Sequence, residues 1–190
     1  MLFRLASPED AASLLRIYGQ YIETAVTFEE VLPTEAEFAE RIRSTRTEFP
    51  YLVCEDEEGI LGYAYAHRKF ERAAYRWVAE LSVYLDRQVR GKGIGAALYA
   101  RLCTLLRAQG YALAFAVVTT PNPGSERFHD KLGFLRRAEM PDVGYKNGHW
   151  YGIIWFEKRL LPKSDAPKDP IPFPKLDAAQ TADILNFEPL

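Results

Sequence analysis

The chain has 190 residues, of which 48% are apolar and 26% are charged, and its formal net charge is −2. This size and balance predict a single globular domain and exclude a largely disordered chain. No apolar run approaches the roughly 20 residues of a membrane-spanning helix, and the small net charge offers nucleic acid no general attraction, so we expect neither a membrane nor a nucleic-acid partner.

The N-terminal quarter of the chain predicts one strand and two helices. Residues 1–5 are typical of a strand. Residues 7–10 combine a capping serine, a proline at the first helical position and an acid three residues after the cap, which together predict a helix start. Thr34 and Glu37 repeat the capping pattern, so a second helix is expected there, ending before Pro50.

The middle of the chain predicts a sheet with two more helices. Strands are expected over 51–55, 60–68, 77–85, 112–119 and 151–160, a partly extended segment over 134–143, and helices over 95–109 and 125–132. Asn147-Gly148 is a tight-turn signal before the last strand. This order predicts an α/β (α+β) fold with a mixed, mainly antiparallel central sheet flanked by helices.

The composition changes after Leu161. Five prolines follow between Pro162 and Pro174, and they argue against a helix or a central strand in this segment. We therefore divide the chain into a domain over residues 1–161 and a Pro-rich C-terminal extension over residues 162–190. The apolar side chains of the extension can anchor it to the domain or to a second subunit, and we expect it to pack across a dimer. These side chains are Ile171, Phe173, Leu176, Ile184, Leu185 and Phe187.

The N-terminus and the cysteines indicate a reducing compartment. The first residues lack the charged, apolar and small-residue regions of a secretory signal. Cys54 and Cys103 are too few for a disulfide framework or a zinc site. We therefore expect a cytoplasmic protein without a bound metal, in which both cysteines are small core residues.

A glycine-rich segment between a predicted strand and a predicted helix is the most informative motif. Glycines let the backbone turn and expose successive N–H groups, and a helix start adds the positive end of its dipole, so such a segment can cradle an anion. Arg87, Arg90 and Lys92 add local positive charge. An ordinary glycine-rich turn is the alternative. The motif reads Arg90-Gly91-Lys92-Gly93-Ile94-Gly95.

Two better-known phosphate loops do not fit this segment. The dinucleotide fingerprint requires the loop directly after a strand and an acid about 20 residues further on. Here residues 86–89 intervene, and residues 111–119 contain no acid. The P-loop requires Gly-Lys-Ser/Thr after four spacer residues, and that sequence is absent.

The glycine-rich segment resembles the acetyl-CoA loop of the GNAT superfamily of N-acetyltransferases, Gln/Arg-x-x-Gly-x-Gly/Ala, through Arg90, Gly93 and Gly95. Residues 122–134 resemble a second superfamily segment, Asn-x-x-Ala/Ser followed by Leu-Gly-Phe. A closer similarity, over about residues 2–160, is to the phosphinothricin acetyltransferase subgroup, which includes enzymes acting on methionine sulfoximine and methionine sulfone. The segments that carry it are 21–24, 75–80, 82–84, 98–99 and 146–150.

The resemblance implies a GNAT-like fold, a homodimer and acetyl-CoA as co-substrate. It implies that backbone groups from Leu81 to Val83 meet the pantetheine and the thioester oxygen, and that Asn122 binds a pantetheine amide. From the residues alone, Asn122 is equally an ordinary Asn-Pro turn. The expected acetyl-CoA contacts are Leu81, Ser82, Val83, Arg87, Arg90, Gly91, Lys92, Gly93, Ile94, Gly95, Asn122 and Ser125.

Glu80 is the candidate general base. Alternate residues of strand 77–85 form an apolar face, and Glu80 lies on the other face. Position alone favours a solvated glutamate, whereas the resemblance implies a base that acts through a water. For the acid that protonates the leaving thiolate, the resemblance offers His129 and Tyr99. Their alternatives are a helix-surface histidine and a core aromatic, and solvent is the remaining proton donor.

The acceptor contacts implied by the resemblance are Phe28, Arg72 and Tyr75, with Arg72 able to pair with a carboxylate. One position departs from the subgroup: Glu29 stands where an arginine is common, which argues against a phosphinate-bearing substrate. We expect direct acetyl transfer in a ternary complex to the amine of a small, amino-acid-like molecule. The alternatives are acetylation of a protein N-terminus or lysine, and a non-enzymatic acyl-CoA sensor.

Overall fold

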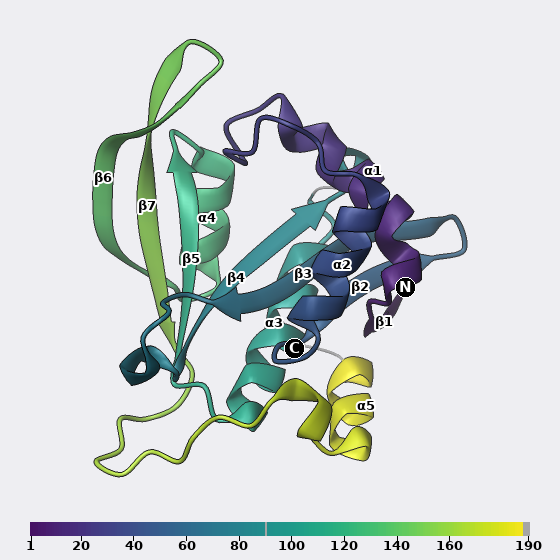
Figure 1. Ribbon diagram of the computed structural model, residues 1–190, viewed down its shortest axis with the longest axis vertical. Coiled ribbons are helices and arrows are strands. Elements are labelled where there is room, and N and C mark those ends of the chain that lie inside the picture. Colours follow the sequence, from purple (N-terminus) through teal and green to yellow (C-terminus); the bar gives the residue numbers. More distant parts are fainter. Residues whose placement is uncertain (90, 188–190) are drawn as a thin grey trace.

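The computed structural model describes residues 1–89 and 91–187 (Figure 1). The described residues form a seven-stranded sheet in the order β1-β2-β3-β4-β5-β7-β6. Neighbouring strands are antiparallel except β4 and β5, which are parallel, and this confirms the predicted mixed, mainly antiparallel sheet. The strands are β1 (Leu2–Leu5), β2 (Tyr51–Asp56), β3 (Gly59–Arg68), β4 (Val78–Leu85), β5 (Leu113–Thr120), β6 (Leu135–Lys146) and β7 (His149–Arg159).

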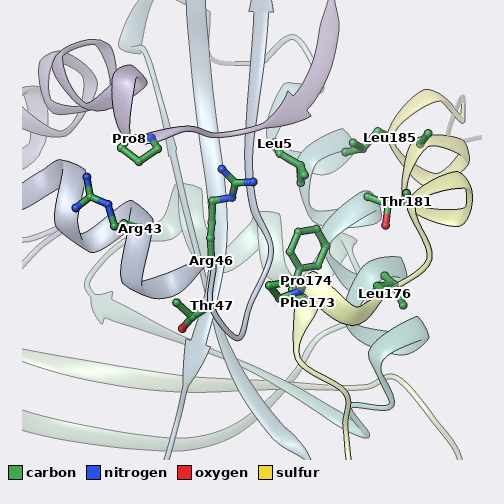
Figure 2. A pocket seen from close by; sticks show the side chains of 12 residues that line it. Leu5, Pro8, Arg43, Arg46, Thr47, Phe173, Pro174, Leu176, Thr181 and Leu185 are labelled. Carbon is green, nitrogen blue, oxygen red and sulfur yellow. The ribbon is translucent and has the colours of Figure 1, made fainter.

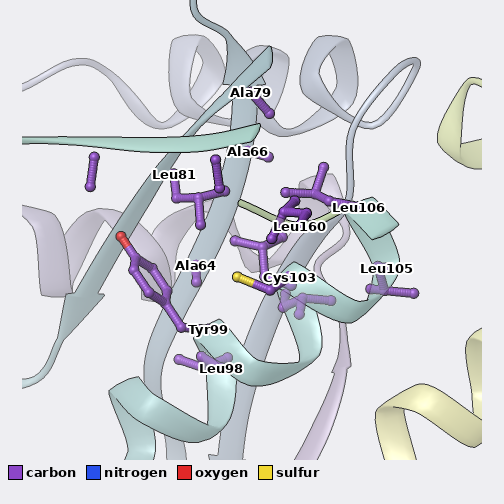
Figure 3. Packing of buried hydrophobic residues seen from close by; sticks show 14 of the residues in the cluster. Ala64, Ala66, Ala79, Leu81, Leu98, Tyr99, Cys103, Leu105, Leu106 and Leu160 are labelled. Carbon is purple, nitrogen blue, oxygen red and sulfur yellow. The ribbon is translucent and has the colours of Figure 1, made fainter. Parts of the chain in front are cut away.

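Helices cover both faces of the sheet. The helices are α1 (Ala11–Ile22), α2 (Glu35–Thr45), α3 (Ile94–Gln109), α4 (Pro123–Lys131) and α5 (Ala178–Asn186). Alternation along β3 explains the two layers, because successive side chains point to opposite faces. Tyr63 packs in the cluster with α1 and α2, whereas Ala64 and Ala66 pack in the cluster with α3. Figure 3 shows this second cluster, in which Tyr99 of α3 lies near Leu81 of β4.

The two predicted capping patterns differ in outcome. Thr34 caps α2 as predicted, since its Oγ1 accepts from Glu37 N and the Glu37 carboxylate accepts from Thr34 N at 2.7 Å. At the first helix, Ser7 N donates to the Asp10 carboxylate at 2.7 Å, but residues 8–10 form a 3₁₀ turn. The α-helix therefore begins at Ala11, one turn later than predicted.

Strands β4 and β5 pair over only part of their length. The ladder joins residues 78–80 of β4 to residues 113–115 of β5. Beyond this point β4 continues to Leu85 and β5 to Thr120, and the two strands diverge, as Figure 1 shows. The divergence opens a cleft in the middle of the sheet.

The C-terminal extension folds back on the domain of its own chain. Phe173 and Ile184 are buried in the core that α3 forms with the sheet, and Leu176 packs against that core. The buried Gln109 side chain of α3 donates to Ile171 O at 2.8 Å and to Glu48 O at 2.9 Å. These side chains of the extension therefore pack against the domain of the same chain, which is one of the two partners that the sequence analysis considered.

The prediction that the extension lacks a helix is wrong for its last part. No proline lies between Pro174 and Pro189, and Asp177 caps α5 by accepting a hydrogen bond from Gln180 N at 2.8 Å. The buried Arg101 of α3 donates to Leu185 O at 2.9 Å, which satisfies a carbonyl at the end of α5. An apolar groove with Arg43 and Arg46 on one side lies where the extension meets α2 (Figure 2).

If this docking stabilises the domain, Phe173→Ala should lower the free energy of unfolding by about 3 kcal/mol, the usual cost of truncating a buried phenylalanine. Urea unfolding followed by tryptophan fluorescence measures the change. Ile171→Ala is the matched control in the same segment, since Ile171 is 40% exposed, and it should cost less than about 1 kcal/mol. If both variants lower the free energy of unfolding by the same small amount, burial of Phe173 does not stabilise the domain.

Candidate active site

The cleft between β4 and β5 is lined by backbone as well as side chains. Residues 81–83 of β4 pair on one side with residues 64–66 of β3. Their other edge has no partner strand, because β5 has diverged, so N–H and C=O groups of β4 face the cleft. The cleft brings together seven of the predicted site residues: Leu81, Ser82, Val83, Tyr99, Asn122, Ser125 and His129.

His129 and Tyr99 meet inside this cleft. His129 is 3% exposed and lies on α4, with its ring stacked on Phe156 of β7. Its Nδ1 is 2.8 Å from Ser125 O, and its Nε2 is 3.5 Å from the Tyr99 hydroxyl of α3. A carbonyl oxygen only accepts, so Nδ1 carries the hydrogen and, in the neutral ring, Nε2 is left as an acceptor.

Burial keeps both groups uncharged. It lowers the pKa of His129 below its ordinary value, so the imidazole is neutral near pH 7. It also raises the pKa of Tyr99 well above the usual tyrosine value, so the phenol keeps its proton. Both residues line the cleft, and Tyr99 is therefore the one whose hydroxyl can donate a proton, with His129 Nε2 as its acceptor in this structure.

Asn122 is used at least partly as a cap. Its Oδ1 accepts from Ser125 N at 3.2 Å and begins α4, with Pro123 at the first helical position. The same residue lines the cleft. Asn122 can therefore serve as a turn and cap residue and also bind a ligand, because the cap uses only its amide oxygen and leaves the amide NH2 group free to donate.

The glycine-rich segment leads into the N-terminus of α3. Gly91 and Gly93 have φ values of +81° and +80°, a region that residues with a Cβ rarely adopt. No atom lies within 4 Å of a Cβ placed on either, so the space beside them is open. Ile94 and Gly95 are buried at the helix start, and Lys92 is exposed. Arg90, which the sequence also predicts here, lies outside the described residues.

Arg87 lies beside this segment, in a 3₁₀ turn that follows β4. Its guanidinium carbon is 5.4 Å from the centre of the Tyr21 ring, and its backbone N–H donates to the Gln20 side chain at 3.0 Å. The exposed charges of Arg87 and Lys92 thus flank the turn and the positive end of α3, an arrangement that suits a phosphate group.

Glu80 is the last residue of β4 that pairs with β5, so it lies where the cleft begins. Its Oε2 accepts a hydrogen bond from the Lys69 ammonium at 2.7 Å, and its Oε1 is 4.0 Å from His67 Nε2. The side chain is 18% exposed. The carboxylate is therefore held in a largely buried ion pair, whereas position alone favoured a solvated glutamate.

The three predicted acceptor contacts lie at different places around the site. Phe28, in the loop after α1, covers Gly144 of β6 and is near Tyr151, with ring centres 6.5 Å apart. Tyr75 packs on Phe70, with ring centres 4.7 Å apart. Arg72 is exposed and has no ion pair within the described part of the chain. Among the described residues, no hydrogen bond or ion pair joins any of the three to Glu80.

Comparison with known proteins assigns the chain to a family. The family model for the acetyltransferase (GNAT) domain matches residues 3–155. The chain belongs to the GNAT acetyltransferase family. Its similarity to a phosphinothricin N-acetyltransferase of Streptomyces viridochromogenes is 34% identity over 170 residues, which cover 88% of this chain and 93% of the relative.

Two further proteins are similar over most of the chain. The L-methionine sulfoximine/L-methionine sulfone acetyltransferase of Pseudomonas aeruginosa is 33% identical over 169 residues, covering 86% of this chain and 97% of the relative. The crystal structure of a GNAT phosphinothricin acetyltransferase from Sinorhizobium meliloti, described as a complex with AcCoA, has a TM-score of 0.82 and 33% identity. It covers 90% of this chain and 97% of that one.

Two lysines that the sequence analysis did not select shape this GNAT site. Lys69 holds Glu80, as described above. Lys146 is 3% exposed, and its ammonium donates to Ile22 O, Thr27 O and Glu29 O at 2.6, 2.7 and 2.7 Å. Burial lowers the pKa of Lys146. These bonds tie the loop between α1 and α2 to β6, and so fix the loop that carries Phe28.

The described residues contain no group of three or more His, Cys, Asp or Glu side chains placed to hold a metal ion. Within the same residues, no helix is long and apolar enough to cross a membrane.

Gly93→Ala tests the glycine-rich segment as a binding site. An alanine at φ +80° costs about 1–2 kcal/mol, so the turn should shift and the affinity for CoA should fall about 10-fold by calorimetry. Gly59→Ala is a matched control, since Gly59 also has positive φ and open space but is the first residue of β3, directly after the β2–β3 turn. It should lower the melting temperature without changing the CoA affinity. Equal CoA affinity in both variants would exclude the segment from the binding site.

Proposed function

We propose that this protein transfers the acetyl group of acetyl-CoA to the amine of a small, amino-acid-like acceptor, of the phosphinothricin, methionine sulfoximine or methionine sulfone type. The observation that carries the proposal is the position of Glu80 at the point where β4 and β5 diverge, next to the unpaired backbone edge of residues 81–83. A base and a row of N–H donors then border the same space.

Acetyl-CoA supplies an acetyl group activated as a thioester, and the protein supplies three things. Glu80 accepts a proton from the acceptor ammonium, through a water, because α-amines titrate near about 8 and are mostly protonated at neutral pH. Backbone N–H groups of residues 81–83 donate to the thioester oxygen as negative charge builds on it. The amine nitrogen attacks the thioester carbon to form the N–C bond, and collapse of the tetrahedral intermediate breaks the C–S bond. The nitrogen loses its second proton to solvent, from which the group that protonates the thiolate regains its own.

Tyr99 gives its proton to the departing thiolate in this proposal. It keeps that proton because burial raises its pKa, and it lines the cleft. His129 holds its hydrogen on Nδ1 toward Ser125 O, so its Nε2 orients the Tyr99 hydroxyl rather than acting as the acid. Direct attack on the thioester agrees with the cysteines, because Cys54 and Cys103 are buried free thiols whose pKa burial raises to about 11.

The binding roles follow the same geometry. Asn122 and Ser125 border the pantetheine path, and the turn at Gly91 and Gly93 with Arg87 and Lys92 takes the phosphates. The proposal also includes a cytoplasmic location, expected from the N-terminal residues and the two cysteines, and a homodimer, supported by the family resemblance alone. Glu29, which forms an ion pair with Arg41 at 2.8 Å, continues to argue against a phosphinate-bearing acceptor.

Glu80→Gln should lower turnover at least about 10-fold, because it removes a general base, and leave acetyl-CoA affinity nearly unchanged. Thiol release is measured against phosphinothricin, methionine sulfoximine, methionine sulfone, free amino acids, spermidine and N-terminal peptides. Glu58→Gln, at an exposed turn, is the control and should behave as the wild type. Near-normal turnover of Glu80→Gln removes it as the base. Thiol release with peptides alone would favour a protein acceptor. Binding of acetyl-CoA without thiol release from any acceptor would favour an acyl-CoA sensor.

Tyr99→Phe and His129→Ala separate the two candidates for the acid. We expect Tyr99→Phe to lower turnover at least about 10-fold, and His129→Ala to lower it less, since it only orients the hydroxyl. Both variants are first shown to bind acetyl-CoA. A larger loss in His129→Ala would make the histidine the acid, and unchanged turnover in both would mean that solvent protonates the thiolate.

A further inference from the structure

Lys69 occupies an unusual position for a lysine. It directly follows β3, and its ammonium lies between the Glu80 carboxylate at 2.7 Å and the face of the Trp155 ring, whose centre is 4.4 Å away. The Lys69 side chain is only 9% exposed. Lysine is among the residue types least often buried, so this side chain is held by an ion pair and a cation–π contact instead of by water.

The Lys69–Glu80 pair is incompletely hydrogen-bonded. Within the described part of the chain, the bond between them is the only one that either charged group makes. An ammonium has three donors, and a carboxylate can accept several hydrogen bonds. Groups as buried as these are normally satisfied more fully. Both members of the pair therefore keep capacity for a ligand.

The aromatic residues beside Lys69 form a wall around Trp155, and this wall also contains a hydrogen-bond donor without an acceptor in the described part of the chain. The indole Nε1 of Trp155 is buried and has no acceptor among the described residues. Phe70 and Phe115 lie on two sides of the same ring, each with its centre 6.2 Å from that of Trp155, and Tyr75 extends the wall from Phe70. The pair is thus placed against an aromatic surface that suits an apolar side chain.

We propose that Lys69 and Glu80 together bind the zwitterionic head of the acceptor, with Lys69 taking its α-carboxylate and Glu80 its α-amine. The inference rests on the proposed function and specifies its acceptor. An α-amino acid carries both charges on one carbon, so it can present a carboxylate to the ammonium and an amine to the carboxylate at once. The internal ion pair is exchanged for an ion pair of Lys69 with the ligand carboxylate and a water-bridged one of Glu80 with the ligand ammonium, so Glu80 is left near the amine that must lose its proton.

The exchange explains selectivity through the cost of an unpaired charge. Removing one partner of a buried ion pair is strongly unfavourable, because the other charge stays buried and uncompensated. An amine without a carboxylate that paired with Glu80 would leave the Lys69 ammonium buried without a partner charge. An amino acid compensates both charges, so the site favours acceptors with a free α-carboxylate over their amides.

Lys69 fits the carboxylate role better than Arg72. The sequence analysis selected Arg72, but that side chain is exposed and has no ion pair within the described part of the chain. Ion pairs at exposed positions contribute little. The ammonium of Lys69 is already beside Glu80, where the amine must be.

The test compares an amino acid with its carboxamide in wild type, Lys69→Met, Lys69→Arg and Lys163→Met. The amino acid is the one that the wild type acetylates best, or L-methionine sulfone as a binding probe if it acetylates none. The wild type should prefer the acid at least about 10-fold in kcat/KM. Lys69→Met should lose this preference, Lys69→Arg should keep most of it, and Lys163→Met, an exposed control in the extension, should match the wild type.

Calorimetric binding of the same two ligands, in the presence of CoA, separates this inference from the proposed function. If thiol release is absent but the acid still binds more tightly than the amide, and only while Lys69 is present, the subsite stands and the catalytic proposal fails. If the preference for the acid is unchanged in Lys69→Met, or the wild type does not distinguish acid from amide in rate or in binding, the subsite is wrong.

Discussion

The structure depends on one constraint, the short parallel contact between β4 and β5. The two strands pair over three residues each, ending at Glu80 and Phe115, and then diverge. Unpaired backbone groups inside a protein are costly unless something else binds them. The diverging strands therefore create the cleft, along which backbone N–H and C=O groups of β4 are available to a ligand. Tyr99 from α3 and His129 from α4 line the cleft on the side of the helices.

The same constraint gives the C-terminal extension a role in the geometry of the site. Helix α3 follows the glycine-rich turn and carries Tyr99, so its position decides where the turn and the Tyr99 hydroxyl lie. One face of α3 packs on the sheet, while buried polar side chains on it, Arg101 and Gln109, bond carbonyls of the extension. The helix is thus fixed from two sides, and a segment far from the cleft supports the groups inside it.

Much of the fold was predictable because periodicity and caps are local. The capping pair at Thr34 and the alternation that puts Glu80 on its own face of β4 could be read directly from the sequence. The role of Lys69 could not be read from the sequence. Its position beside Glu80 depends on the register of β3 and β4, which sets His67 opposite Glu80. Lys146 was missed for a related reason: its three acceptors lie more than a hundred residues away in the chain, and lysines are expected at the surface.

A largely buried ion pair at the start of the cleft is better explained by exchange than by stability. Such a pair stabilises a fold little, since the cost of removing both charges from water offsets most of their attraction. An apolar pair would fill the space beside Trp155 at lower cost. What Lys69 and Glu80 offer instead is a matched set of charges with spare hydrogen-bonding capacity, next to the row of backbone donors on β4. Charges placed this way keep the site prepared for a ligand that carries the complementary pair.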